Sequence, residues 1–183
     1  MENQITKLGK QITQKNITVC FVRHGTYYSY EDLKRGNLNP YGISKTKELC
    51  KYLKDFAGEK QIILWTSSVM RAVQSAEIIS ENLKNETFNG VFVEKRVLHN
   101  DAEPGCKDLF DDCEEGSFVI IVSHEPTIKF IGFEILGRGY GTGYSEAQII
   151  YPNLSRKVIF KHVEKEWVVI EEKPLNLLLK KNH

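Results

Sequence analysis

An arginine, a histidine and a glycine follow directly after a short apolar segment near the start of the chain. The segment, residues 17–22, is rich in β-branched side chains and predicts a buried strand. Arg23 and His24 then stand at its carboxyl end, where ligands bind in α/β sheets. Gly25 suits a tight turn or a close approach of the backbone to a ligand. Taken alone, this tripeptide marks either a site or the start of a surface loop.

A second apolar strand also ends on a histidine, and the repetition favours a site. Residues 118–122 lead into Ser123 and His124, and Glu125 follows as a side chain that could orient a neighbour. Two strands that each present a histidine at the carboxyl end are a constellation that chance explains poorly.

A second arginine lies at the start of a predicted helix. Residues 61–65 predict a strand, and Ser67 and Ser68 after it are good caps for a helix that runs to about residue 83. Arg71 falls in the first turn, where the helix dipole disfavours positive charge. A bound anion would explain it, because helix N-termini and guanidinium forks both attract phosphate. The alternatives are an exposed arginine, and serines that act as caps, as phosphate ligands or as both.

Two arginines and two histidines placed in this way suit phosphoryl transfer. Two guanidinium groups can hold the oxygens of one phosphoryl group and neutralise the charge that develops during transfer. An unprotonated histidine can attack phosphorus and form a covalent intermediate. The sequence has no P-loop motif and nothing that resembles a metal cage, so we expect a metal-independent reaction without a cofactor.

Strands and helices alternate along the chain, which predicts one layered α/β domain over residues 17–183. Residues 1–16 are a polar lead-in that either frays or forms a short helix. The remaining expected elements are helices at 44–56, 107–113 and 126–136, a strand at 90–98, and an edge hairpin of strands at 157–163 and 167–171. Loops at 27–39, 99–105 and 138–145 would decide specificity, and tyrosines 27, 28 and 30 either border the site or only cover their loop.

The composition excludes several classes of protein. The net charge of +1 argues against a nucleic-acid binder, and no apolar run approaches the length of a membrane span. The first fifteen residues lack the apolar core of a secretory signal, so we expect a cytoplasmic protein. The four cysteines match no zinc pattern and are interpreted as reduced and structural. The oligomeric state leaves no mark on the sequence.

Three motifs, in this order and spacing, resemble the histidine phosphatase superfamily, also called phosphoglycerate mutase-like. The motifs are Arg23-His24-Gly25, Ser67-Ser68-x-x-Arg71-Ala72-x-Gln74-Ser75-Ala76 and Ser123-His124. The resemblance covers about residues 17–136 and implies a three-layer α/β/α sandwich with a mixed, mostly parallel central sheet. It also implies that His24 is the phosphorylated nucleophile. Arg23, Arg71 and His124 would complete the phosphate site, with Gly25 and Ser67 beside them.

Departures from the family pattern favour its small members. Larger members carry a glutamate proton donor in a Leu-x-Glu context, where this chain has Leu98-His99-Asn100. Asp101 and Glu103 are the candidate proton donors nearby, and Asn39 replaces the threonine of the family's Leu-Thr-x-x-Gly. The chain therefore looks most similar to SixA-type phosphohistidine phosphatases. Their imidazole leaving group needs a strong general acid less than an alkoxide does.

The expected function is that of a metal-independent phosphatase that works through a phosphohistidine intermediate. Its substrate would be phosphohistidine on a protein or a small phosphate ester, and we expect neither nucleic acid nor membrane as a partner. Two alternatives remain. A phosphoglycerate mutase-type phosphotransferase would need a carboxylic acid where Asn100 stands, and a non-catalytic phosphate-binding module is disfavoured because all four core residues are present.

Overall fold

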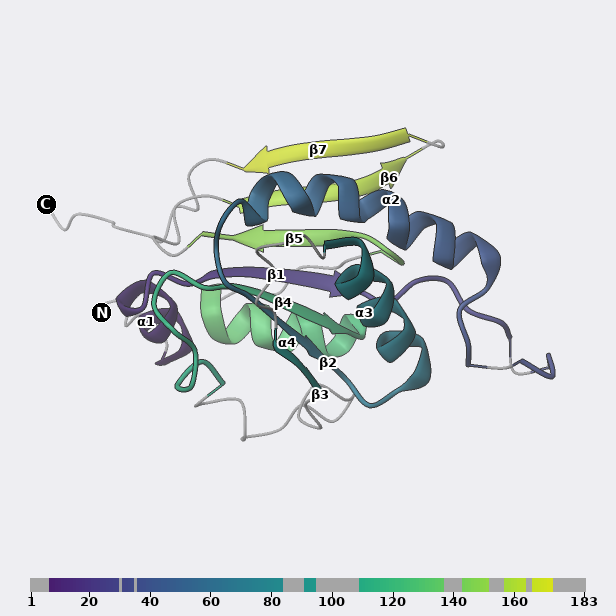
Figure 1. Ribbon diagram of the computed structural model, residues 1–183, viewed down its shortest axis with the longest axis horizontal. Coiled ribbons are helices and arrows are strands. Elements are labelled where there is room, and N and C mark those ends of the chain that lie inside the picture. The colour runs from purple at the N-terminus through teal and green to yellow at the C-terminus, as the bar shows by residue number, and fades with distance from the viewer. Residues whose placement is uncertain are drawn as a thin grey trace, which may run out of the picture.

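The computed structural model describes residues 7–29, 31–34, 36–83, 91–94, 109–136, 143–151, 157–163 and 166–172. Its strands are β1 (Thr18–Arg23), β2 (Ile62–Thr66), β3 (Val91–Glu94), β4 (Phe118–Ser123), β5 (Ala147–Ile150), β6 (Lys157–Val163) and β7 (Glu166–Glu172). Its helices are α1 (Lys7–Gln14), α2 (Pro40–Ala57), α3 (Met70–Leu83) and α4 (Glu125–Leu136). Together the strands form one sheet in the order β3-β2-β4-β1-β5-β6-β7 (Figure 1).

The sheet is mixed. Strands β3, β2, β4 and β1 pair in parallel, whereas β5, β6 and β7 continue the sheet in antiparallel pairs. The predicted edge hairpin is confirmed as β6 and β7. The parallel strands β1, β2 and β4 bury nearly every residue, as expected for strands covered on both faces.

Alternation along the strands divides the core into two layers. In β1, Val19 and Phe21 face one side of the sheet, and Cys20 and Val22 face the other. The first side packs against α1 and α4, and the second packs against α2 and α3 (Figure 1). This is the predicted three-layer sandwich.

The lead-in before β1 contributes to the core. Of the two alternatives for residues 1–16, the short helix is observed as α1, and residues 1–6 lie outside the described part. Leu8 and Ile12 of α1 are buried in the same cluster as apolar residues of α4. This apolar pair, one helical turn apart, docks α1 together with Gln11, which donates to Asp111.

Helix α2 begins four residues before the predicted start at residue 44. Pro40 and Gly42 precede the predicted start, since both residue types commonly end or interrupt helices, but Pro40 occupies the first turn, where its missing N–H costs nothing. The Asn39 side chain caps this helix, with its Oδ1 accepting from the Gly42 N–H at 2.9 Å. Gly42 is required there because a Cβ would lie 2.1 Å from the carbonyl oxygen of Thr26.

Replacing the cap residue tests this account of α2. Asn39→Ala should lower the free energy of unfolding by about 1 kcal/mol, because a backbone N–H at the helix start loses its acceptor. Urea unfolding of this variant beside Asn39→Thr, which retains a side-chain oxygen, measures the effect. Equal losses in the two variants would contradict the capping role.

The prediction of a helix at residues 107–113 is wrong for residues 109–113, which are the part of it that the structure describes. Residues 109–112 form turns, with Leu109 and Phe110 buried. The Lys15 ammonium donates to the carbonyl oxygens of Phe110, Asp111 and Cys113, so these carbonyls point to a side chain from another part of the chain. Of the strand predicted at residues 90–98, only 91–94 are described, as β3.

Candidate active site

The register of the sheet brings the two histidines together. Strands β1 and β4 are parallel neighbours, and Arg23 at the end of β1 lies opposite Ser123 at the end of β4. His24 and His124 therefore leave adjacent strands at the same level, with their ring centroids 5.0 Å apart. Strand β2 flanks β4 on its other side and delivers Ser67 to the same edge.

His24 is held as one defined tautomer. Its Nδ1 lies 2.9 Å from the carbonyl oxygen of Gly25, and Arg71 Nε lies 3.0 Å from its Nε2. Because a carbonyl only accepts and an arginine N–H only donates, the ring proton sits on Nδ1 and the lone pair on Nε2. The phosphorus-attacking atom of this histidine would therefore be Nε2.

Burial keeps the His24 ring neutral. The residue is 3% exposed, and desolvation lowers its pKa to about 3, assisted by the positive fields of His124, Arg71 and Arg23. The hydrogen bond to Gly25 works in the opposite direction, but it is the smaller effect. At neutral pH the Nε2 lone pair is therefore present in essentially every molecule.

The depressed pKa makes the stability of the protein depend on pH. The unfolded chain has an ordinary His24 pKa of 6.5 and the folded chain one of about 3, so acid favours the unfolded state between these values. Above pH 6.5 the ring is neutral in both states and His24 does not lower the free energy of unfolding. As the pH falls from 6.5 toward 3, the free energy of unfolding decreases by up to about 1.4 kcal/mol per pH unit. Urea unfolding of wild type and His24→Gln from about pH 7 to about pH 4 measures it. Identical pH slopes in the two proteins would refute the assignment.

Arg71 is placed by the start of α3. Ser75, one turn further along, accepts from the Gly25 N–H at 3.0 Å and donates to the Arg71 carbonyl at 2.8 Å. Gln74 accepts from the Leu38 N–H at 2.7 Å. These polar residues of the second motif thus tie the helix to the turn after β1, which fixes Arg71 against His24.

Gly25 packs closely against α2, where a side chain would be tight. A Cβ at this position would lie 3.0 Å from the Gly42 carbonyl oxygen and 3.1 Å from Thr46 Oγ1. The sequence predicted a tight turn or a close approach of the backbone to a ligand at Gly25, and the close neighbour in the structure is the start of α2.

Arg23 lies between a carboxylate and an aromatic ring. Its Nη1 donates to Glu125 Oε2 at 3.0 Å, and its Cζ lies 3.9 Å from the centroid of the Tyr144 ring. The other oxygen of Glu125 pairs with Lys129 at 2.7 Å. The hydrogen bond from Lys129, and then the field of Arg23, hold the pKa of Glu125 below its usual value. Glu125 therefore contacts Arg23 as an anion, which is the neighbour-orienting contact that its position suggested.

Ser67 contacts the second histidine. Its buried Oγ lies 2.9 Å from His124 Nε2 and also accepts from the Val69 N–H at 3.4 Å. The Ser67 hydroxyl therefore both accepts from the backbone just before α3, as a helix cap does, and contacts His124 of the site. Ser68 is exposed.

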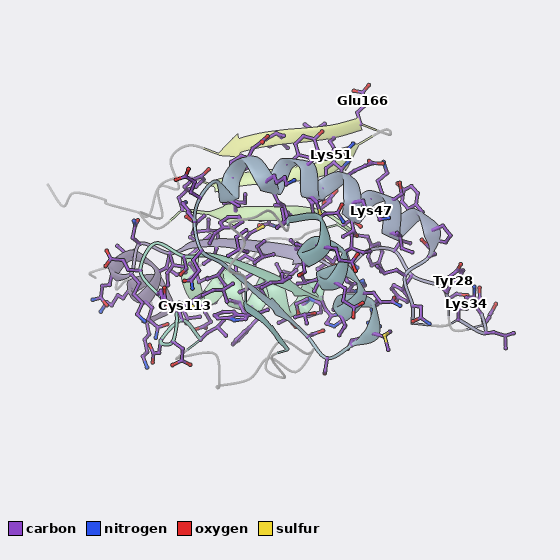
Figure 2. All side chains as sticks on the ribbon, viewed as in Figure 1. Tyr28, Lys34, Lys47, Lys51, Cys113 and Glu166 are labelled. Atoms are coloured by element: carbon purple, nitrogen blue, oxygen red, sulfur yellow. The ribbon has the colours of Figure 1, made fainter. Side chains whose placement is uncertain are left out.

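Two tyrosine rings flank His24, and only one belongs to the tyrosines considered from the sequence. Tyr27 and Tyr144 have centroids 5.5 and 5.4 Å from that of His24. Tyr28 and Lys34 mark the connection from β1 to α2, which projects at this end of the molecule (Figure 2). Tyr144 lies in the 138–145 loop that was expected to decide specificity, but the residue itself was not singled out, because that loop has no motif. Tyr30, His99, Asn100, Asp101 and Glu103 lie outside the described residues.

The residues that the structure describes include no cluster of three or more His, Cys, Asp or Glu side chains able to hold a metal ion. No helix in the same part of the chain is both long and apolar enough to cross a membrane. Cys20, Cys50 and Cys113 are buried free thiols, and burial raises the pKa of Cys50 to about 12.

Comparison with known proteins places the fold. No protein-family model matches the sequence, and no curated protein does. Among solved structures, the protein histidine phosphatase SixA complexed with tungstate aligns with a TM-score of 0.58 at 18% identity, covering 87% of this chain and 99% of its own. Phosphoglycerate mutase from Plasmodium falciparum aligns with a TM-score of 0.59 at 16% identity, and the alignment covers 85% of this chain and 98% of that one. A mycobacterial glucosyl-3-phosphoglycerate phosphatase complexed with VO3 aligns with a TM-score of 0.53 at 12% identity, covering 85% of this chain and 97% of its own.

These alignments confirm the predicted fold. The chain has the phosphoglycerate mutase-like α/β/α fold, and the solved structures similar to it include the SixA proteins that the sequence motifs resemble.

Proposed function

We propose that this protein is a histidine phosphatase that hydrolyses phosphate compounds through a covalent phosphohistidine at His24. The observation that carries the proposal is the neutral, buried imidazole whose Nε2 lone pair lies beside Arg71 while Nδ1–H is held by Gly25. A nucleophile with its proton already placed away from the attacking atom needs no general base. Every phosphate substrate of such an enzyme requires this free lone pair, whatever its leaving group.

In the first step Nε2 of His24 forms a bond to phosphorus while the bond from phosphorus to the leaving atom breaks. The leaving atom takes that electron pair and is then protonated. His24 becomes a cationic N-phosphoimidazole, and the Gly25 carbonyl oxygen, 2.9 Å from Nδ1, stabilises the developing positive charge.

Arg23, Arg71 and His124 supply positive charge and hydrogen-bond donors to the phosphoryl oxygens in this proposal. Arg71 Nε–H donates to the nucleophile in this structure, and substrate binding would transfer guanidinium donors to oxygen and release the lone pair. Ser67 would hold His124 in place rather than bind phosphate directly, since its hydroxyl lies against the imidazole. Two relatives of the same fold, complexed with tungstate and VO3, bind oxyanions, which supports an anion site in this protein too.

In the second step water attacks phosphorus and the bond to Nε2 breaks, so its electron pair returns to the imidazole. Inorganic phosphate leaves, the proton of the water passes to phosphate or solvent, and His24 is neutral again. Asp101 and Glu103 remain the candidate proton donors for leaving groups more basic than imidazole. We include phosphohistidine on a protein and small phosphate esters as substrates.

Trapping of the covalent intermediate tests this function. The protein is mixed with ³²P-labelled phosphoimidazole or labelled 4-nitrophenyl phosphate, quenched in alkali and separated by electrophoresis. We expect label on the protein that survives alkali and is lost in acid, as phosphohistidine is. Retention of phosphate binding with neither label nor turnover would favour a binding module. Label that passes to a second phosphate ester rather than to water would favour a mutase.

A further inference from the structure

The two arginines of the site are each covered by a tyrosine ring. Arg23 Cζ lies 3.9 Å from the centroid of Tyr144, and Arg71 Cζ lies 4.6 Å from the centroid of Tyr27. The two rings come from loops more than a hundred residues apart in the chain, yet their centroids are 6.0 Å apart in a T-shaped contact. Tyr27 and Tyr144 form one aromatic unit, which we call the tyrosine pair.

Contact with the tyrosine pair leaves N–H donors of both guanidinium groups for other partners. A cation is attracted to the face of an aromatic ring without using its N–H groups, and a guanidinium has five of them. Arg23 donates one to Glu125, and Arg71 donates one to His24. Each tyrosine therefore contacts the charged end of its arginine, and further N–H groups remain to donate to an oxyanion.

The tyrosine pair also borders the nucleophile. The rings of Tyr27 and Tyr144 lie within 5.5 Å of the His24 ring, centroid to centroid, and Tyr144 is 41% exposed although His24 is 3% exposed. For attack, phosphorus must come to about 3 to 3.5 Å from Nε2. The leaving group then remains on the side of the phosphoryl group away from Nε2, and among the described residues the rings of Tyr27 and Tyr144 lie beside His24 to contact it.

We propose that the tyrosine pair selects phosphate compounds whose leaving group is a flat aromatic ring, either an aryl group or an imidazole. This inference rests on the proposed function, because it places the phosphoryl group between Arg23 and Arg71. A flat ring stacks on or against tyrosine with a favourable geometry. A hydroxylated aliphatic group would instead place its polar atoms against ring faces that cannot satisfy them.

Binding of two phosphonates tests the selection without any turnover. Phenylphosphonate and cyclohexylphosphonate share a charge and a similar size, and they differ in whether the ring is flat and aromatic. Calorimetry on the wild type should show phenylphosphonate binding about threefold to tenfold more tightly. The preference should persist in Tyr27→Phe and Tyr144→Phe, which retain the rings. It should fall toward unity in Tyr27→Leu and Tyr144→Leu, which retain apolar bulk only.

The ratio of the two affinities separates selection from structural damage. A leucine variant that only misplaces an arginine would weaken both phosphonates equally and leave the ratio unchanged, and this result would overturn the inference. Equal binding of both compounds by the wild type would overturn it too, while the proposed function would stand. Binding of neither compound, together with no phosphoenzyme, would overturn both.

Turnover then identifies which aromatic group the site takes. The wild type is given phenyl phosphate, phosphoimidazole and cyclohexyl phosphate. Because the three leaving groups differ in intrinsic reactivity, each kcat/KM is compared with that of Tyr144→Leu for the same compound. A larger loss for phenyl phosphate indicates an aryl substrate, and a larger loss for phosphoimidazole indicates a phosphohistidine. An equal or larger loss for cyclohexyl phosphate would overturn the inference.

Discussion

Replacing His24 by alanine is expected to abolish the phosphoenzyme and to lower kcat by at least about 10,000-fold, which is the scale of loss when a covalent nucleophile is removed. The reason lies in the geometry of one atom. Nε2 of His24 holds a lone pair beside Arg71, and nothing else in the described part of the site combines a neutral imidazole with that position. Steady-state kinetics and labelling of the variant measure the loss.

Added imidazole provides a sharper form of the same test. The alanine variant leaves space where the ring stood, so free imidazole should restore part of the turnover without restoring label on the protein. His162→Ala is the matched control, because His162 lies on β6, two strands from β1, and its removal should leave kcat within about twofold. Residual label on His24→Ala at the wild-type level would assign the nucleophile elsewhere.

Replacing Arg71 by lysine should lower kcat by about 100-fold to 1,000-fold, although the charge is unchanged. Lysine carries its three N–H donors on one atom and lacks the planar fork, so beside Tyr27 it cannot present the spaced, parallel donors of a guanidinium. The kinetics of Arg71→Lys and the affinity for tungstate measure the effect. We expect weaker tungstate binding as well, because ground-state oxyanion contacts are lost together with those in the transition state.

Two further variants separate the shape of Arg71 from its charge. Arg71→Ala removes both and should lose more activity than Arg71→Lys. Lys51→Ala removes one charge from the outer face of α2, where Lys47 and Lys51 project from the helix (Figure 2), and should have no effect on kcat. Wild-type activity in Arg71→Lys would show that a point charge suffices there.

The candidate site was largely predictable because its residues stand at strand ends and helix starts. An apolar run that stops at Arg23-His24, and another that stops at Ser123-His124, are local patterns that report where two strands end. The alternation of such strands with amphipathic helices predicted the layered fold, which the structure confirms. The catalytic roles of His24, Arg23, Arg71 and His124 remain predictions.

Local patterns were less informative where a contact from elsewhere in the chain decides the outcome. A helix was predicted at residues 107–113, but residues 109–112 form turns, and the Lys15 ammonium donates to carbonyl oxygens of this segment. At α2 the apparent breakers Pro40 and Gly42 belong to the helix, because Asn39 caps it and Gly42 packs against Thr26. In each case the deciding partner is one that periodicity does not reveal.

The chemistry of His24 shows the same division most clearly. Its residue type and its place at the end of a strand follow from the sequence, and they imply a ligand-facing histidine. Its tautomer, its low pKa and its tyrosine neighbours depend on Gly25, Arg71, burial and a loop that arrives from beyond α4. A sequence specifies which groups the chain carries, but only packing removes water from a group and sets the partners of each nitrogen. The reactivity of this imidazole therefore belongs to the tertiary structure.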